Sequence, residues 1–182
     1  MIYPSLLRPT SQESFALPGG TLAIPKAELT LRRWTGAPVA NTFGGKPLID
    51  FAGRPLFAEL CVYELLRLSG WEARWVETYG APAMRPNHFT AWADAGLASQ
   101  RHDPITDTVV IDQLQRQAVA NQNSFAGCWD LVAWQGEQVL FAELKRLRQD
   151  RVRPSQHRWL EAGLRIGLQA ESFLLVEWDF AG

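Results

Sequence analysis

The sequence predicts an α/β fold in which one mixed central sheet is flanked by helices, with its main elements in the order helix, strand, strand, strand, helix, strand. Three stretches predict it. Residues 55–70 carry a helical stripe of apolar residues, residues 128–146 form two apolar strand patterns joined by a short turn, and residues 154–178 form a helical pattern followed by a strand pattern. Helix and strand patterns that alternate in this way pack as layers around a single sheet.

Length and composition limit the class of protein. The chain has 182 residues, of which 47% are hydrophobic and 20% charged, as expected for one globular domain with a sizeable core. The formal net charge of −1 counts against a protein that coats nucleic acid, because such domains are strongly basic. Any nucleic-acid binding must therefore come from a local basic patch.

The cysteines and the apolar runs predict the environment. Cys61 and Cys128 lie in apolar stretches without metal-ligand spacing, which predicts buried, reduced thiols and a cytoplasmic location. No run approaches the ~18 consecutive apolar residues of a membrane span, and the N-terminus lacks the pattern of a signal peptide. We therefore expect no membrane association.

The first half of the chain has three predicted parts. Residues 1–53 are rich in Pro, Gly, Ser and Thr and predict an irregular N-terminal arm, in which residues 21–24 and 29–34 could form edge strands. A helix is expected from Pro55, a favoured first residue, to a stop at Gly70. A strand should follow over residues 71–79.

The second half carries the clearer patterns. Residues 80–127 are interrupted by prolines and predict an insertion, with a helix only over 111–121. A hairpin is expected around Gly136, which suits a type II′ turn, whether its loop is the two residues 136–137 or the four residues 135–138. A helix from Pro154 to Gly167 and a strand over 172–178 complete the order.

Either hairpin loop gives the same strand register and brings two acids together. Trp134 faces Val139, Val132 faces Phe141, and Asp130 therefore faces Glu143. Directly opposed residues have Cβ atoms roughly 4.5–5.5 Å apart, and two like charges at that separation are unfavourable unless a cation lies between them. The pairing predicts a divalent cation.

Lys145 joins the two acids, because it lies two residues beyond Glu143 and so on the same face of the strand. The neighbouring residues of both strands are apolar, which predicts a sheet covered on both faces. Carboxylate oxygens suit Mg²⁺, which keeps several water molecules for reaction and for substrate phosphate. Lys145 would stabilise the attacking water or the developing negative charge at phosphorus.

Asp130, the Glu143-Leu144-Lys145 triplet and Gln156 on the next helix together resemble the PD-(D/E)XK nuclease superfamily, and most closely its VRR-NUC branch. The resemblance covers residues 55–180 and is specific over 128–178; Trp129 stands where the family commonly has proline. It implies a restriction-endonuclease-like αβββαβ core over residues 54–182. It also implies an endonuclease, dependent on Mg²⁺ or Mn²⁺, that acts on branched, flapped or junction DNA in repair, recombination or phage replication.

The resemblance also assigns roles to residues. It implies that Asp130 and Glu143 bind the metal, that the backbone carbonyl of Leu144 is a further ligand, and that Lys145 is the catalytic lysine. Gln156 matches a glutamine that many members place near the site. A glutamate of the first helix often completes the metal site, and Glu59 is the better match, with Glu64 as its rival.

A basic cluster follows the predicted site directly. Its arginines suit bidentate contacts to phosphate and predict a DNA-binding surface, although the segment could also be a solvated loop. The cluster consists of Arg146, Arg148, Arg151, Arg153 and Arg158.

Other readings of the sequence remain open or fail. A non-catalytic nucleic-acid-binding or assembly module would keep the fold and use the basic cluster, and a restriction-type enzyme would read base sequence through residues 80–127. A substrate with two-fold symmetry, such as a four-way junction, would predict a homodimer. Residues 44–47 lack the full pattern of a nucleotide-binding loop, and no Gly-x-Ser-x-Gly motif supports a serine hydrolase.

Overall fold

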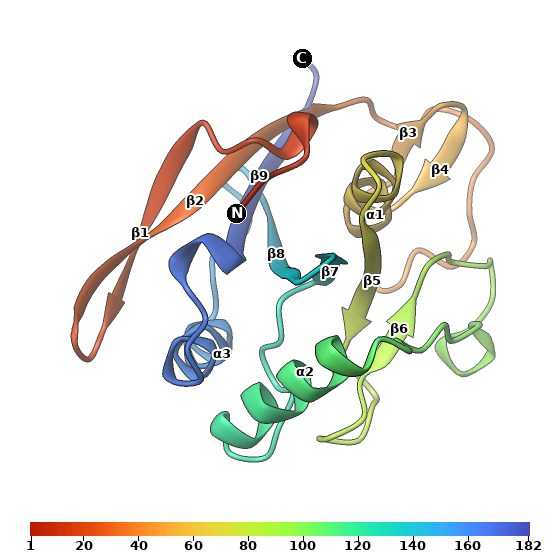
Figure 1. Ribbon diagram of the computed structural model, residues 1–182. Helices are drawn as coiled ribbons and strands as arrows, with labels where there is room; N and C mark the ends of the chain where they lie inside the picture. Colours follow the sequence, from red (N-terminus) through yellow and green to blue (C-terminus); the bar gives the residue numbers. More distant parts are fainter.

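A seven-stranded mixed sheet forms the centre of the computed structural model, which describes residues 1–182 (Figure 1). The strand order is β1-β2-β9-β8-β7-β5-β6, and β9 runs parallel to both of its neighbours, β2 and β8, while the other pairs are antiparallel. The strands of this sheet are β1 (Ser11–Leu17), β2 (Gly20–Leu31), β5 (Glu72–Glu77), β6 (Asn87–Phe89), β7 (Leu131–Gln135), β8 (Gln138–Arg146) and β9 (Phe173–Phe180).

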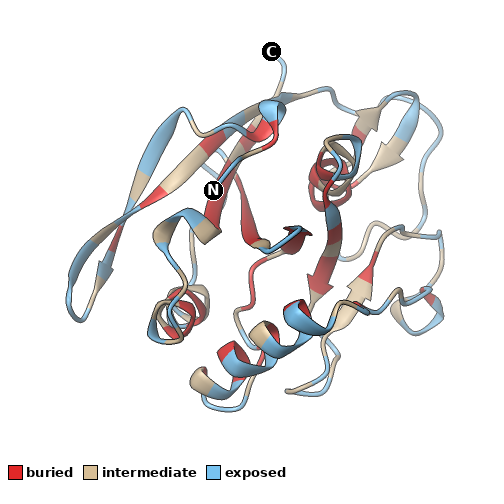
Figure 2. Ribbon diagram, viewed as in Figure 1, coloured by how far each residue is buried: buried red, intermediate tan, exposed pale blue.

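Three α-helices cover the sheet: α1 (Ala58–Leu68), α2 (Thr108–Ala120) and α3 (Pro154–Arg165). Figure 1 shows α1 apart from α2 and α3, and the two sides are separate hydrophobic clusters. The alternation of side chains along β7 explains the two clusters: Leu131 and Ala133 pack in the cluster with α1, and Val132 and Trp134 pack in the cluster with α3. The most buried segments in Figure 2 are accordingly the central strands. The predicted mixed α/β fold with a sheet covered on both faces is confirmed.

The predicted hairpin is confirmed as β7 and β8. Trp134 pairs with Val139 and Val132 with Phe141, and the loop is the two residues between Gln135 and Gln138. Gly136 has a φ of +58°, as the first central position of a two-residue turn requires.

Helix α1 begins at Ala58, three residues later than predicted, because Pro55 belongs to a small second hairpin. In it, β3 (Ile49–Phe51) pairs with β4 (Arg54–Leu56) through a turn at Ala52 and Gly53, whose φ values are +50° and +79°. Proline is compatible with such a short strand, because it only removes one donor. The predicted stop of the helix is confirmed, since Gly70 has a φ of +80°.

The prediction of an irregular arm over residues 1–53 is wrong for its first half, although the strands allowed over 21–24 and 29–34 overlap β2, which lies inside the sheet rather than at its edge. β1 and β2 form a hairpin, and β2 pairs in parallel with β9 from Lys26 to Leu31. Phe15, Ile24 and Ala27 are buried in the core. The low hydrophobicity of this segment conceals the strands, because β1 lies at the edge of the sheet and buries only one of its residues.

Residues 80–127 add to the central layers. β6 extends the sheet beyond β5, and α2 corresponds to the helix predicted over 111–121, beginning three residues earlier. Asp107 sets that start, because its carboxylate accepts hydrogen bonds from the backbone N–H groups of Val109 and Val110. The buried Gln117 then donates from Nε2 to the carbonyl of Trp159 at 2.9 Å, which ties α2 to α3.

Helix α3 and strand β9 follow the sequence prediction closely. Pro154 is the first residue of α3, and Gly167, with a φ of +99°, follows its end. Cys61 and Cys128 are free and buried, as predicted. None of the helices combines the length and the apolar character that crossing a membrane requires.

Candidate active site

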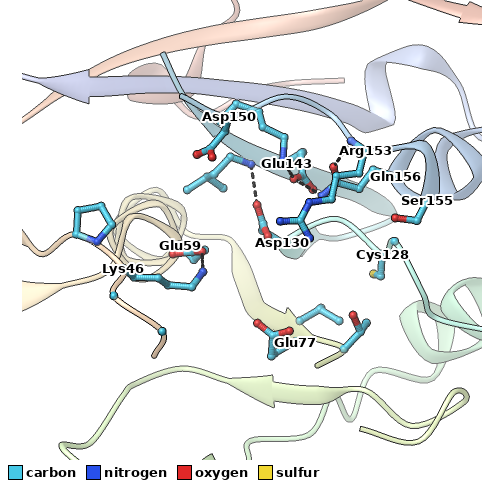
Figure 3. Close-up of a pocket in the computed structure, with 18 residues that line it drawn as sticks. Lys46, Glu59, Glu77, Cys128, Asp130, Glu143, Asp150, Arg153, Ser155 and Gln156 are labelled. Atoms are coloured by element: carbon cyan, nitrogen blue, oxygen red, sulfur yellow. Dashed lines mark hydrogen bonds and ion pairs between the residues drawn. The ribbon is translucent and has the colours of Figure 1, made fainter. Parts of the chain in front are cut away.

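A pocket of about 580 Å³ lies at the open end of the β7–β8 hairpin, away from its turn, between α1 and the N-terminus of α3 (Figure 3). Five carboxyl groups and three basic groups line it, so acid is in excess. The carboxyl groups belong to Glu59, Glu77, Asp130, Glu143 and Asp150, and the basic groups to Lys46, Lys145 and Arg153.

Asp130 lies immediately before β7. The β-ladder ends at the pair Leu131 and Ala142, so the predicted pairing of Asp130 with Glu143 falls one step beyond the paired residues. The Asp130 carboxylate instead accepts a hydrogen bond from the backbone N–H of Leu144 at 2.9 Å. Burial raises the pKa of Asp130 to about 6, and the charge of Glu59 adds to this, against the opposing effects of Lys46 and Lys145. The proton affinity of Asp130 is therefore set mainly by its burial and is then adjusted by the charges of Glu59, Lys46 and Lys145.

Glu143 is the most deeply buried acid of the pocket, with a relative exposure of 0%. Its Oε1 accepts hydrogen bonds from Lys145 Nζ and from Gln156 Nε2, both at 2.5 Å. Its Oε2 has no partner. Burial and the nearby Asp130 raise the pKa of Glu143 well above its usual value, and only part of this is offset by Lys145. An unpartnered carboxylate oxygen at this depth is costly, so its position indicates a further ligand.

Gln156 reaches Glu143 because of how α3 begins. Its Oε1 accepts from the backbone N–H of Arg153 at 2.8 Å, while its Nε2 points to Glu143. Gly127 lets this helix start approach the chain before β7: a Cβ at residue 127 would lie 2.2 Å from the carbonyl oxygen of Ser155. The prediction that Gln156 lies near the acids is confirmed.

Of the two candidate glutamates on α1, the structure brings only one to the pocket. Glu59 lines it and pairs with Lys46, whereas Glu64 pairs with Arg54 at 2.9 Å outside it. Burial lowers the pKa of Lys46, but the nearby acids Glu59, Asp130 and Glu77 outweigh this effect and the net pKa is raised.

Three lining residues escaped the sequence analysis. In the sequence Lys46 belongs to a stretch that lacks the full pattern of a nucleotide-binding loop, Glu77 lies in a predicted strand, and Asp150 is the one acid among the arginines of the basic cluster. Burial is the largest cause of the raised pKa of Glu77. Asp150 accepts from the backbone N–H of Arg146 at 3.2 Å. In the sequence these three residues are distinguished only as charged residues near the ends of predicted elements. Many solvent-exposed residues have the same property, so it does not identify a site.

The five arginines of the basic cluster separate in space. Arg153 lines the main pocket, and Arg151 lines a neighbouring one together with Lys145. Arg146 does not line the main pocket, since its Nε donates to Asp179 at 3.2 Å and its guanidinium lies over the ring of Phe180, but it lines an adjoining pocket with Lys46 and Glu59. Arg148 and Arg158 are exposed and line neither pocket.

The residues fit a divalent cation that keeps several water ligands. In the present side-chain arrangement, no group of three or more His, Cys, Asp or Glu residues is close enough to hold a metal ion. A Mg²⁺ site, however, often uses only one or two carboxylates besides water and substrate oxygens. Asp130 and the unpartnered Oε2 of Glu143 supply these donors, and two positive charges would balance the excess of acid in the lining.

Neither family models, nor curated proteins, nor solved structures match this chain.

Proposed function

We propose that this protein is a metal-dependent DNA endonuclease with a restriction-endonuclease-like core, using Mg²⁺ or Mn²⁺ to hydrolyse phosphodiester bonds. The observation that carries the proposal is Glu143: a fully buried carboxylate with one oxygen held by Lys145 and Gln156 and the other without a partner, in a pocket shared with Asp130.

The arrangement of elements supports this proposal. α1, β5, β7, β8, α3 and β9 follow the αβββαβ order of the PD-(D/E)XK superfamily, with β1, β2, β3, β4, β6 and α2 as additions. The residues that carry the sequence resemblance, Asp130, Glu143, Lys145 and Gln156, all line one pocket. In the proposed site Asp130, Glu143 and the Leu144 carbonyl would hold the ion, and Glu59 is the nearest further acid from α1.

Each group of the pocket would have a definite task. The bound ion would lower the pKa of a coordinated water and offset phosphate charge. Lys145, held at Oε1 of Glu143, would stabilise negative charge that develops on the phosphoryl oxygens. Gln156 fixes the orientation of Glu143 through the same oxygen. Arg153, exposed at the pocket, would contact a neighbouring phosphate of the strand.

Without the ion the pocket repels its substrate, because its lining has more carboxyl than basic groups. Binding of phosphodiester at the pocket itself therefore depends on the metal. We infer a preference for DNA structure over base sequence from the resemblance to VRR-NUC domains. A cytoplasmic setting and a homodimer on symmetric junctions are further parts of this proposal.

A non-catalytic module is the second candidate, and one observation favours it. Glu59 pairs with Lys46 and Glu143 with Lys145, so ion pairs already satisfy part of the pocket. Such a module would bind DNA through Arg151 and Arg153 and would cut nothing.

The deciding experiment is cleavage of labelled linear, flapped and four-way-junction DNA by the full chain with Mg²⁺, with Mn²⁺ and with EDTA. We expect cutting that needs the metal and falls by about a hundredfold or more in Asp130→Asn and Lys145→Ala. The exposed Asp112→Asn and the strand residue Lys26→Ala serve as matched controls and should cut normally. Intact DNA in every lane, with DNA binding retained, would favour the non-catalytic module.

A further inference from the structure

Lys46 occupies an unusual place among the acids of the pocket. Its ammonium pairs with Glu59, a residue with a relative exposure of 8%, and lies 5.3 Å from the ring centre of Trp75. Figure 3 shows the Lys46 and Glu59 side chains on the side of the pocket opposite Arg153, with their charged ends toward the space between Asp130 and Glu77. The positively charged ammonium group of Lys46 therefore already lies among the acids of the pocket.

The turn that carries Lys46 is anchored to the core through Phe43, which packs against Trp75 and Trp92, whereas its two glycines are not in contact with other parts of the chain. Gly44 and Gly45 have φ values of +79° and +85°, and a Cβ at either would meet no atom within 4 Å. The backbone N–H of Lys46 bonds within the same turn, to the carbonyl of Thr42 at 2.9 Å. Withdrawal of the ammonium from Glu59 therefore needs only rotation of the flexible four-carbon side chain of Lys46, while the turn stays in place.

The ion pair between Lys46 and Glu59 affects how the pocket would bind a divalent ion. Lys46 neutralises one of the acids that would attract a divalent ion, and its ammonium would repel an ion bound beside Glu59 and Asp130. Lys145 differs, because it is held at Glu143 on the other side of the pocket, within hydrogen-bonding distance of an oxygen that also accepts from Gln156. The two lysines thus act at different acids.

We infer that Lys46 is the resident counter-ion of the pocket and competes with the divalent cation, which must displace its ammonium from Glu59 to bind. This inference rests on the proposed metal site, and it adds a regulation of that site: affinity for the ion is held down by a lysine of the chain itself.

The test is a titration of the metal-free full chain with Mn²⁺, followed by calorimetry and by the electron paramagnetic resonance signal of free Mn²⁺. Lys46→Met and Lys46→Gln remove the charge and should each bind Mn²⁺ at least about tenfold more tightly than the unmodified chain. Lys46→Arg keeps the charge and should bind no more tightly. Arg54→Met is the matched control and should leave the affinity for Mn²⁺ unchanged. Arg54 pairs with Glu64, which lies on the same helix as Glu59 but outside the pocket.

The outcomes separate this inference from the proposed nuclease. Folding of each variant is checked by circular dichroism. Equal or weaker Mn²⁺ binding by folded Lys46→Met and Lys46→Gln, or an equal gain in Arg54→Met, would overturn the inference even if the unmodified chain cuts DNA. Tighter binding in the two neutral variants alone would support it even if no DNA is cut, in which case the nuclease proposal alone fails.

Discussion

Asp130 Oδ2 accepts the backbone N–H of Leu144 at 2.9 Å, just beyond the last paired residues of the β7–β8 ladder. This hydrogen bond holds the carboxylate beside β8 at Leu144. The two neighbours of Leu144 in β8, Glu143 and Lys145, also line the pocket. Asp130, immediately before β7, and the Glu-Leu-Lys triplet of β8 are therefore one structural unit.

Asp130→Asn should stabilise the metal-free protein at neutral pH. The pKa of Asp130 is raised to about 6, so its protonated form favours the folded state; this stabilisation is complete below the unfolded pKa of about 4 and is lost as the pH rises through 6. An amide avoids the loss and can still accept from Leu144. Thermal unfolding in EDTA should show a gain of roughly 3 kcal/mol at pH 7.5 that vanishes below about pH 4. A less stable variant at pH 7.5 would mean that the ionised carboxylate is favourable where it lies.

Gly127→Ala should destabilise the protein strongly. Gly127 has a φ of +84°, and its added Cβ would lie 2.2 Å from the Ser155 carbonyl oxygen, which is backbone and cannot rotate away. We expect a loss of about 3 kcal/mol, or a fall in Tm of about 6–12 °C. Gly136→Ala is the control: its φ is +58° but its Cβ would meet nothing, so it should cost only about 1 kcal/mol. Equal losses in the two variants would show that α3 yields to the added methyl.

Arg153→Ala should reduce the salt dependence of DNA binding, whereas Arg146→Ala should not. Arg153 is exposed at the pocket, while Arg146 is held by Asp179 and packed over Phe180. Loss of one phosphate contact lowers the slope of log K against log salt by about 0.9. Fluorescence anisotropy with labelled junction DNA between about 50 and 200 mM salt measures it. A change in slope confined to Arg146→Ala would instead place the DNA at the adjoining pocket that Arg146 lines with Lys46 and Glu59.

A chain reduced to residues 54–182 should not fold cooperatively. β2 pairs with β9 over six residues, and the first 53 residues also supply Leu7, Phe15, Ile24 and Ala27 to the core. Their loss would expose one edge of β9 and the apolar surface beneath. Circular dichroism and the dispersion of amide proton resonances compare it with the full chain. A sharp thermal transition of the shortened chain would show that these residues are an appendage.

The parts of the fold that could be predicted are those with strong local patterns. The β7–β8 hairpin has a continuous apolar run on each side of Gly136, and α3 has a proline at its start and a glycine after its end. β1 was not predicted, because it buries a single residue at the edge of the sheet, and β2 was predicted only in part, because its partner β9 is more than 140 residues away in the chain. A strand whose stability comes from so distant a pairing needs little apolar character of its own.

The sequence by itself determined which residues share a strand face, because the two-residue period and the hairpin loop set the register of Val132 with Phe141 and the position of Lys145 beside Glu143. The family resemblance favoured Glu59 over Glu64, but only the tertiary structure brought Glu59 to the pocket, directed Arg146 to Asp179 and added Lys46 to the acids. These positions depend on how α1, the residue 42–48 turn and α3 pack around the sheet. Such packing depends on contacts between distant segments, and no local pattern of residues encodes them.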